Sequence, residues 1–341
     1  MHRTLGLLIA GLVIIAAVPL LLGGSGMFAQ LAHFPLSLLA VMIGMIFVCW
    51  YLNAAKLRVL LAGRSGHLTR RESMGVIMAV EFAICATPGG AGGVLTLIAL
   101  MKQRGMRPAQ TTAVFAVDQM IDLLFFFASM LAMVVYIIVK AVDIPTGWLL
   151  GMPLLLMGCA FTALFTMGRY QGGVMRGMAR LMKLIRLNAS RRRQWLRKLM
   201  VFRNSLKETL QMPKRLLLLA FFFGVLHWIV RYSVLYLALY GLGKPIDWGF
   251  TYLAQMLSMA AGQLTLLPGG AGGAELSSMA LLSPMVGQET ASAAILIWRA
   301  VTYYFYLIAG FPAFLLLAGR PLFNRLMQMK KGDLDEDHKR P

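Results

Sequence analysis

The hexapeptide Pro-Gly-Gly-Ala-Gly-Gly occurs twice in this chain, at residues 88–93 and 268–273, and each copy interrupts a long apolar run. Proline lacks a backbone N–H and glycine accepts a positive φ, so the hexapeptide predicts a break in a helix that would otherwise cross a membrane. Lipid cannot satisfy the backbone groups that such a break frees, and the break must therefore lie inside protein or line a wet cavity. Two such breaks in corresponding places point to the binding site of a transporter.

Composition places the chain among multi-pass membrane proteins. It is 59% hydrophobic and 13% charged over 341 residues, which is too apolar for a soluble enzyme. The net charge of +20 comes from basic residues between the apolar runs, where they set orientation and attract anionic lipid; nucleic acid is not an expected partner. Cys49, Cys85 and Cys159 lie in apolar runs without metal-type spacing, so we expect them to pack, and no metal or other cofactor is predicted.

The distribution of lysine and arginine decides the topology. Basic residues follow the second apolar run, starting at Lys56, and they also occupy 102–107 and 169–215. If residues 73–101 crossed the membrane completely, the strongly basic segment 169–215 would be exported, against the positive-inside rule. We therefore interpret 73–101 as two half-helices that enter from the cytoplasm, turn at the hexapeptide and return. The segment 169–215 then lies in the cytoplasm, either as amphipathic helices on the inner leaflet or as a solvated loop.

The apolar and basic segments together predict an all-α polytopic membrane protein with about six full transmembrane helices plus two broken re-entrant helical hairpins. The full helices are expected at about 5–22, 35–55, 109–140, 148–168, 216–240 and 291–318, and the hairpins at about 73–101 and 248–282. The first run is too long for a signal peptide and is kept as a helix. We expect a single transmembrane domain at 1–330 and a disordered tail at 331–341, with both termini in the cytoplasm of a bacterial cell and the spans in its inner membrane.

A shift of 180 residues overlays the two hexapeptides and their flanking apolar runs without a gap. This shift defines repeat A at about 34–141 and repeat B at about 214–320. One additional span between the copies makes them face opposite ways, which is the inverted repeat from which alternating-access carriers are built. The two copies share little identity outside the hexapeptide, and a coincidence of glycine-rich packing motifs is the alternative.

Ionisable side chains at membrane depth cost about 2.5–3.5 kcal/mol at a helix centre, and they usually face the bundle interior. The candidate substrate-binding residues are Gly89, Gly90, Gly92, Gly269, Gly270, Gly272, Glu275, Arg299 and Arg231; the candidate proton or ion-coupling residues are Asp118, Asp122 and Glu81; Gln255 and Gln263 are neutral candidates. The glycine turns expose N–H groups at half-helix N-termini, which suit a phosphate. Arg231 and Arg299 can add bidentate contacts to that phosphate.

Several of these residues have a structural alternative. Asp118 and Asp122 share one helical face, and they either share a proton or pair with Arg231 or Arg299. Glu275 either caps the second turn or binds an amine or a proton. The residues expected to serve packing, or in the case of His227 a hydrogen bond, are His227, Tyr303, Tyr304 and Tyr306.

The second copy resembles a known family. Residues 267–275, together with Arg299 and the Thr-Tyr-Tyr at 302–304, resemble the second half of the membrane region of lysylphosphatidylglycerol synthases. That region also occurs alone in flippase-like proteins, some of them linked to hopanoid or polyprenyl-linked glycan pathways, and the resemblance extends over essentially the whole chain. The first copy departs from the family pattern, because the Arg and Glu after its proline are absent and 118–122 reads Asp-Gln-Met-Ile-Asp, without the arginine. We recognise no soluble aminoacyl-transfer domain, so the resemblance implies the translocating part and not a lysyl transferase.

The predicted function is that of an ATP-independent flippase for a phosphate-bearing amphiphile, such as a phospholipid, a polyprenyl phosphate or a glycolipid. The hexapeptide lacks the Lys-Ser/Thr ending of a phosphate loop, and no nucleophilic triad or paired metal ligands are apparent, so an enzyme is not expected. We expect Glu275→Gln and Arg299→Ala to abolish translocation while the protein stays folded. One alternative is an ion-coupled carrier of a small soluble anion. The other is a non-transporting scaffold whose basic segment 169–215 docks an enzyme of a lipid or glycan pathway.

Overall fold

The computed structural model describes residues 2–61, 68–140, 158, 162, 200–201 and 204–319, and every regular element in this part of the chain is a helix. The elements are α1 (His2–Gly23), α2 (Gly26–Ala32), α3 (Leu36–Leu61), α4 (Arg70–Ala86), η1 (Pro88–Gly90), α5 (Ala91–Gln103), α6 (Pro108–Lys140), α10 (Lys214–Tyr232), α11 (Val234–Gly241), α12 (Trp248–Leu264), η2 (Pro268–Gly270), α13 (Gly273–Val286), α14 (Gln288–Arg299), η3 (Ala300–Tyr304), α15 (Phe305–Phe314) and η4 (Leu315–Gly319). The elements η1 and η2 are 3₁₀ helices, whereas η3 and η4 are π-helices. The predicted all-α class is confirmed for the described residues.

Four helices of the described part are long and apolar enough to cross a membrane, at Leu36–Leu61, Pro108–Val135, Lys214–Gly241 and Gln288–Ala318. A fifth is obtained if α1 and α2 count as one span, although the chain bends by 111° between them. The predicted span 148–168 lies outside the described residues except for 158 and 162, so a total of six stays a prediction. The predicted tail and most of the basic segment 169–215 also lie outside the described residues.

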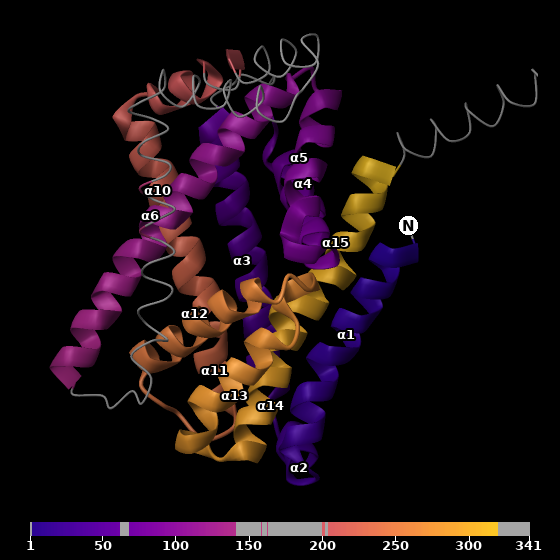
Figure 1. Cartoon of the computed structure of the whole chain (residues 1–341), viewed down its shortest axis with the longest axis vertical. Coiled ribbons are helices and arrows are strands. Elements are labelled where there is room, and N and C mark those ends of the chain that lie inside the picture. The colour runs from indigo at the N-terminus through magenta and orange to yellow at the C-terminus, as the bar shows by residue number, and fades with distance from the viewer. Residues whose placement is uncertain are drawn as a thin grey trace, which may run out of the picture.

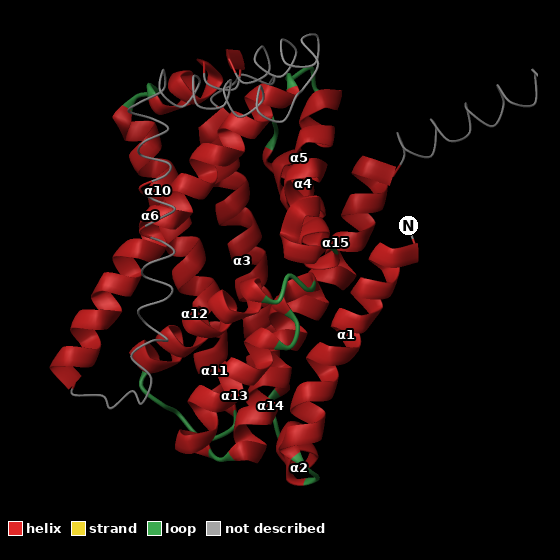
Figure 2. Ribbon diagram, viewed as in Figure 1, coloured by secondary structure: helices red, strands yellow, loops and turns green. Residues whose placement is uncertain are grey.

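Each hexapeptide forms a turn between two helices that pack against each other, and the predicted helix breaks are therefore confirmed. The first hairpin is α4–η1–α5 and the second is α12–η2–α13. In Figure 1 the first hairpin lies in the upper half of the molecule and the second in the lower half; Figure 2 shows the loops of both turns near the centre. The two turns contact each other. The repeated hexapeptides thus meet; the second turn buries Pro268 and Gly270, whereas the first leaves Gly89 and Ala91 exposed.

Glu72 closes the base of the first hairpin. Thr69 caps α4 and forms a capping box with Glu72, whose Oε2 accepts hydrogen bonds from the N–H and from Oγ1 of Thr69, both at 2.8 Å. The other oxygen of Glu72 lies 3.1 Å from Nη2 of Arg104, just after α5. Glu72 and Arg104 are 41% and 29% exposed, so solvent screens this ion pair and its contribution to stability is small.

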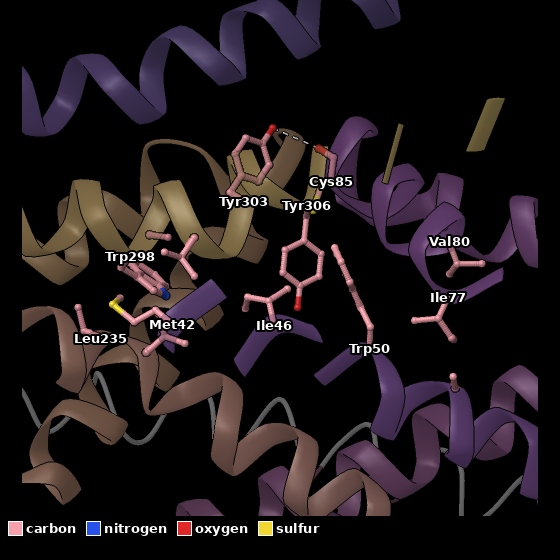
Figure 3. Close-up of a cluster of buried hydrophobic side chains, with 14 of the residues drawn as sticks. Met42, Ile46, Trp50, Ile77, Val80, Cys85, Leu235, Trp298, Tyr303 and Tyr306 are labelled. Carbon is pink, nitrogen blue, oxygen red and sulfur yellow. Dashed lines mark hydrogen bonds between the residues drawn. The ribbon is translucent and has the colours of Figure 1, made fainter. Parts of the chain in front are cut away.

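The core forms where α3 packs along α10 and α15 packs along α4. Trp50 stacks on Phe305 with ring centroids 5.7 Å apart and meets Tyr306 edge-on at 5.2 Å, and Figure 3 shows Trp50 and Tyr306 side by side. Gly310 lets α15 approach α4 closely, because a Cβ on it would lie 2.8 Å from the carbonyl oxygen of Met78. Small residues at such crossings are typical of packed membrane helices.

Candidate functional site

Two left-handed glycines make each turn. The backbone φ is 58° at Gly89 and 69° at Gly90, and 65° at Gly269 and 70° at Gly270. Other residues reach this region only with strain, which explains glycine at these four positions. At Gly269 the space is closed as well, because a Cβ there would overlap the ring of Tyr303.

The identical hexapeptides differ in backbone from their fourth residue onward. Ala91 is helical, with φ −60° and ψ −26°, and α5 begins at this residue. Ala271 is extended, with φ −52° and ψ 141°, and α13 begins only at Gly273. Because the six residues are the same in both copies, the difference must come from their surroundings.

Two flanking residues differ between the copies and bond the equivalent N–H group from opposite sides. In the first copy, Oγ1 of Thr87 accepts a hydrogen bond from the N–H of Gly92 at 2.8 Å. In the second copy, a leucine stands in place of Thr87, and Oε2 of Glu275 accepts the N–H of Gly272 at 2.7 Å. The first copy has Leu95 at the position of Glu275. Two N–H groups that were candidates for binding a phosphate are therefore bonded inside the protein in this conformation.

Glu275 and Arg299 form a buried ion pair beside the second turn. Nε of Arg299 lies 2.6 Å from Oε1 of Glu275, and its Nη1 donates to the carbonyl oxygen of Gly269 at 3.2 Å. The arginine side chain is 2% exposed and the glutamate 0%. Nη2 of Arg299 has no hydrogen-bond partner among the described residues. A buried guanidinium N–H group without an acceptor lowers the stability of the folded state, and it marks a place where an anionic oxygen can bind.

The π-helix η3 begins directly after Arg299 and carries tyrosines toward the first hairpin. Wide turns of this kind occur frequently at functional sites. The hydroxyl of Tyr303 donates to the carbonyl oxygen of Cys85 at 3.2 Å, as drawn in Figure 3. This carbonyl belongs to the last turn of α4, where intrahelical partners are lacking. Tyr303 therefore satisfies a helix end in addition to packing, which the sequence did not predict.

The first helix, α1, covers the second turn on one side. It contacts both η1 and η2. A Cβ on Gly11 would lie 3.5 Å from Cβ of Pro268, so the backbone of α1 approaches the turn closely. The hydroxyl of Tyr304 donates to the carbonyl oxygen of Leu12 at 2.8 Å. These contacts hold α1 against the part of the bundle that contains the Glu275–Arg299 pair.

A second buried group lies between α3, α4, α10 and α15. Nη1 of Arg231 lies 3.6 Å from Oε2 of Glu81 and donates to the hydroxyl of Tyr306 at 3.1 Å. The guanidinium also lies 4.7 Å from the centroid of the Tyr306 ring, which is a cation–π contact. Oε1 of Glu81 accepts a hydrogen bond from Nδ2 of Asn53 at 3.2 Å. Arg231 thus has its own acidic partner, distinct from the one that binds Arg299.

His227 is held by one carbonyl group and one amide. Its Nδ1 lies 3.1 Å from the carbonyl oxygen of Cys49, and its Nε2 lies 3.5 Å from Nδ2 of Asn53. This arrangement suits a neutral ring that donates through Nδ1 and accepts through Nε2. The prediction that His227 forms a hydrogen bond is confirmed. Cys49 and Cys85 are buried and free, as expected for packing residues, and Cys159 lies outside the described residues.

The arginine partners predicted for Asp118 and Asp122 were wrong. Both carboxylates bind Lys56 instead, with their Oδ1 atoms 2.9 Å and 2.8 Å from Nζ. Lys56 does not begin a basic loop, because α3 extends beyond it and buries its side chain. A lysine is rarely buried this completely unless it is paired, and here two acids from α6 pair with it.

Gln255 connects the two arginine groups. With its amide oriented to satisfy both ends, Nε2 donates to the carbonyl oxygen of Tyr232 and Oε1 accepts from Nε1 of Trp298, each at 3.1 Å. Tyr232 directly follows Arg231, and Trp298 directly precedes Arg299. The two ion pairs are therefore linked through one buried amide.

The candidate residues fall into separate sets. The second turn brings together Gly269, Gly270, Gly272, Glu275 and Arg299, and the first turn brings together Gly89, Gly90 and Gly92. Arg231 lies with Glu81, and Asp118 lies with Asp122. Gln263 is exposed. Asn53 and Lys56 were missed, although two polar residues three apart in an apolar run were a usable signal. Over the described residues, no group of three or more His, Cys, Asp or Glu side chains is placed to hold a metal ion.

Two comparisons with known proteins each found a match. A family model described as the lysylphosphatidylglycerol synthase TM region matches residues 8–310. A "UPF0104 membrane protein" of Archaeoglobus fulgidus is 21% identical over 267 residues, which cover 76% of this chain and 80% of the relative. The region matched by the family model contains both hexapeptides and the buried ion pairs described above.

Proposed function

The chain belongs to the family of the lysylphosphatidylglycerol synthase transmembrane region, and from this premise we propose that it moves a phosphate-bearing lipid between the leaflets of a bacterial inner membrane without ATP. The substrate is a phospholipid, a polyprenyl phosphate or a glycolipid. Its headgroup enters the bundle while its tails remain in the surrounding lipid. The site for the headgroup is the second turn with Glu275 and Arg299, and no aminoacyl transfer is proposed.

The free edge of Arg299 is the observation that carries this proposal. One N–H of its guanidinium faces Glu275 and another donates to Gly269, so Nη2 is left for a ligand. A phosphate oxygen is a suitable acceptor, because bonds between guanidinium and phosphate are charge-assisted and short. The geometry therefore suits a headgroup phosphate better than a bulky apolar ligand.

The two hairpins supply the alternating access that translocation needs. The open end of the first hairpin carries Arg70, Arg71 and Lys102, whereas the second begins beside Asp247 and is followed by Glu289. Basic residues favour the cytoplasmic side, so the first hairpin opens toward the cytoplasm and the second toward the outside. Their turns contact each other. A headgroup bound there is reached from either side when one hairpin moves against the other.

Native mass spectrometry of lipids retained by the gently purified protein tests the proposed site. We expect wild type to retain one class of phosphate-bearing lipid, enriched over the bulk, and the double variant Glu275→Gln with Arg299→Gln to lose it. The double variant keeps polar groups and leaves no buried charge unpaired. The matched control is Glu72→Gln with Arg104→Gln, which removes the exposed ion pair of the first hairpin and should retain the lipid. Unselective bulk lipid in all three proteins, or a retained water-soluble anion, would contradict the proposal.

A further inference from the structure

Apart from the headgroup site, Lys56, Asp118 and Asp122 form a charged cluster between α3 and α6. Nζ of Lys56 lies 2.9 Å from Oδ1 of Asp118 and 2.8 Å from Oδ1 of Asp122. The lysine side chain is 3% exposed, and the carboxylates are 24% and 14% exposed. One ammonium group faces two carboxylates, so the cluster carries one excess negative charge when all three groups are ionised.

The surrounding groups do not compensate this charge. Apart from exposed charges at helix ends, the titratable groups on the elements packed against α3 and α6 are Glu81 and Cys85 on α4, His227, Arg231 and Tyr232 on α10, Tyr236 and Tyr240 on α11, Tyr252 on α12, Tyr303 and Tyr304 on η3, and Tyr306 on α15. Arg231 is paired with Glu81, and His227 has the hydrogen bonds of a neutral ring. Among the described residues, Lys56 is the one cation at ion-pair distance from the two aspartates.

We propose that Lys56, Asp118 and Asp122 form a proton-binding site that couples lipid translocation to a proton gradient. Protonation adds one O–H bond to a carboxylate and neutralises the cluster, and no other bond changes. The proton is taken up from the more acidic side of the membrane and released on the other side. The inference rests on the proposed function, because it names the gradient that drives that transport.

A proton fits this site better than a metal cation. The near oxygen of each aspartate already contacts the ammonium group of Lys56, which would repel a second cation at this distance. One carboxylate charge of the cluster has no cation of its own, and the binding of one proton removes it. Acidic side chains inside membrane bundles serve as proton relays in pumps and transporters for this reason.

A chain of hydrogen bonds and ion pairs begins one helical turn from the cluster and leads toward the centre of the bundle. Asn53 lies one turn before Lys56 on α3 and donates to Glu81 at 3.2 Å. Glu81 pairs with Arg231 at 3.6 Å, and Arg231 donates to the hydroxyl of Tyr306 at 3.1 Å. A change of charge at the cluster therefore acts on groups that join α3, α4, α10 and α15. These are the contacts through which protonation can bias the position of the first hairpin.

Infrared difference spectroscopy of the purified full chain in lipid nanodiscs tests the site, through the C=O band of protonated carboxyl groups between about pH 5 and about pH 8. We expect wild type to gain this band as the pH falls. Asp118→Asn and Asp122→Asn should each lose it, because Lys56 fully compensates the remaining aspartate. In Lys56→Gln the band should persist to higher pH, because neither carboxylate then has a cation. A purely structural role does not predict these opposite effects.

The control for the band is Glu72→Gln, which removes an exposed carboxylate at the base of the first hairpin and should leave the band unchanged. Two conservative aspartate variants are used so that a folding defect in one does not decide the result. A wild type without the band, or a band that both aspartate variants retain, would overturn the proton site. These outcomes do not depend on any transport measurement.

Lipid translocation in vesicles with an imposed pH gradient separates this inference from the proposed function. If both are correct, the gradient changes the rate of translocation by wild type and has no effect on Asp118→Asn. If wild type translocates lipid at a rate that does not change with the gradient, the coupling is wrong and the proposed function is unaffected. A titrating carboxyl band in a protein that moves no lipid would support the proton site and contradict the proposed function.

Discussion

Replacing Arg299 with alanine is expected to lower the free energy of unfolding by about 3–5 kcal/mol, because Glu275 then keeps a buried charge without a partner. Glu275 is 0% exposed, and its second oxygen is engaged by the N–H of Gly272. Thermal unfolding of the purified protein in detergent measures the loss. This result would revise the expectation from sequence that the protein stays folded without Arg299, because burial of the pair was not visible in the sequence.

A double variant separates the lost ion pair from the unpaired charge. Glu275→Gln with Arg299→Gln leaves no charge at the site, so we expect it to unfold at a higher temperature than Arg299→Ala. Glu72→Gln with Arg104→Gln removes an exposed pair of similar chemistry and should lower the unfolding temperature only slightly. Equal small losses in all three proteins would contradict a buried ion pair at the second turn.

The second large loss of stability is expected for Gly269→Ala. The left-handed backbone costs a non-glycine residue about 1–2 kcal/mol, and overpacking against the ring of Tyr303 costs about 1–3 kcal/mol more. The φ of 65° at Gly269 and the absence of space for a Cβ are the reasons. We therefore expect a loss of about 2–5 kcal/mol in the free energy of unfolding, measured in the same way.

Gly89→Ala is the matched control, because it changes the equivalent glycine of the first turn. The φ of Gly89 is 58°, but a Cβ there would come no closer than 3.8 Å, to Cδ2 of Leu266. Only the backbone strain of about 1–2 kcal/mol remains. If the two alanine variants lose the same free energy of unfolding, Tyr303 does not pack tightly against the second turn.

The helix breaks could be predicted from sequence because their causes are local. Proline and glycine act through their own backbone, and both turns use left-handed glycines at the same two positions. The different course of the chain after Gly90 and Gly270 could not be predicted from the repeat. It depends on the surroundings of the repeat, including Thr87 and Glu275, which hydrogen-bond the equivalent glycines Gly92 and Gly272 from opposite ends of the repeat.

Side-chain partners were harder to predict, because they depend on which helices pack together. The spacing of Asp118 and Asp122 correctly indicated one shared helical face. Their partner, Lys56, stands near the end of an apolar run, where a basic residue ordinarily marks the start of a loop. Arg299 and Glu275 were each identified as candidates, but their pairing depends on how α13 folds back beside α14, which no local pattern reveals.

The central claim is that the site formed by Glu275 and Arg299 carries a lipid headgroup across the membrane. The most direct measurement is the translocation of a labelled phosphate-bearing lipid in vesicles that contain the purified protein and no ATP. We expect translocation by wild type and by the control Glu72→Gln with Arg104→Gln, and none above empty vesicles by Glu275→Gln with Arg299→Gln. Equal translocation by all three proteins, or none by wild type, would contradict the claim.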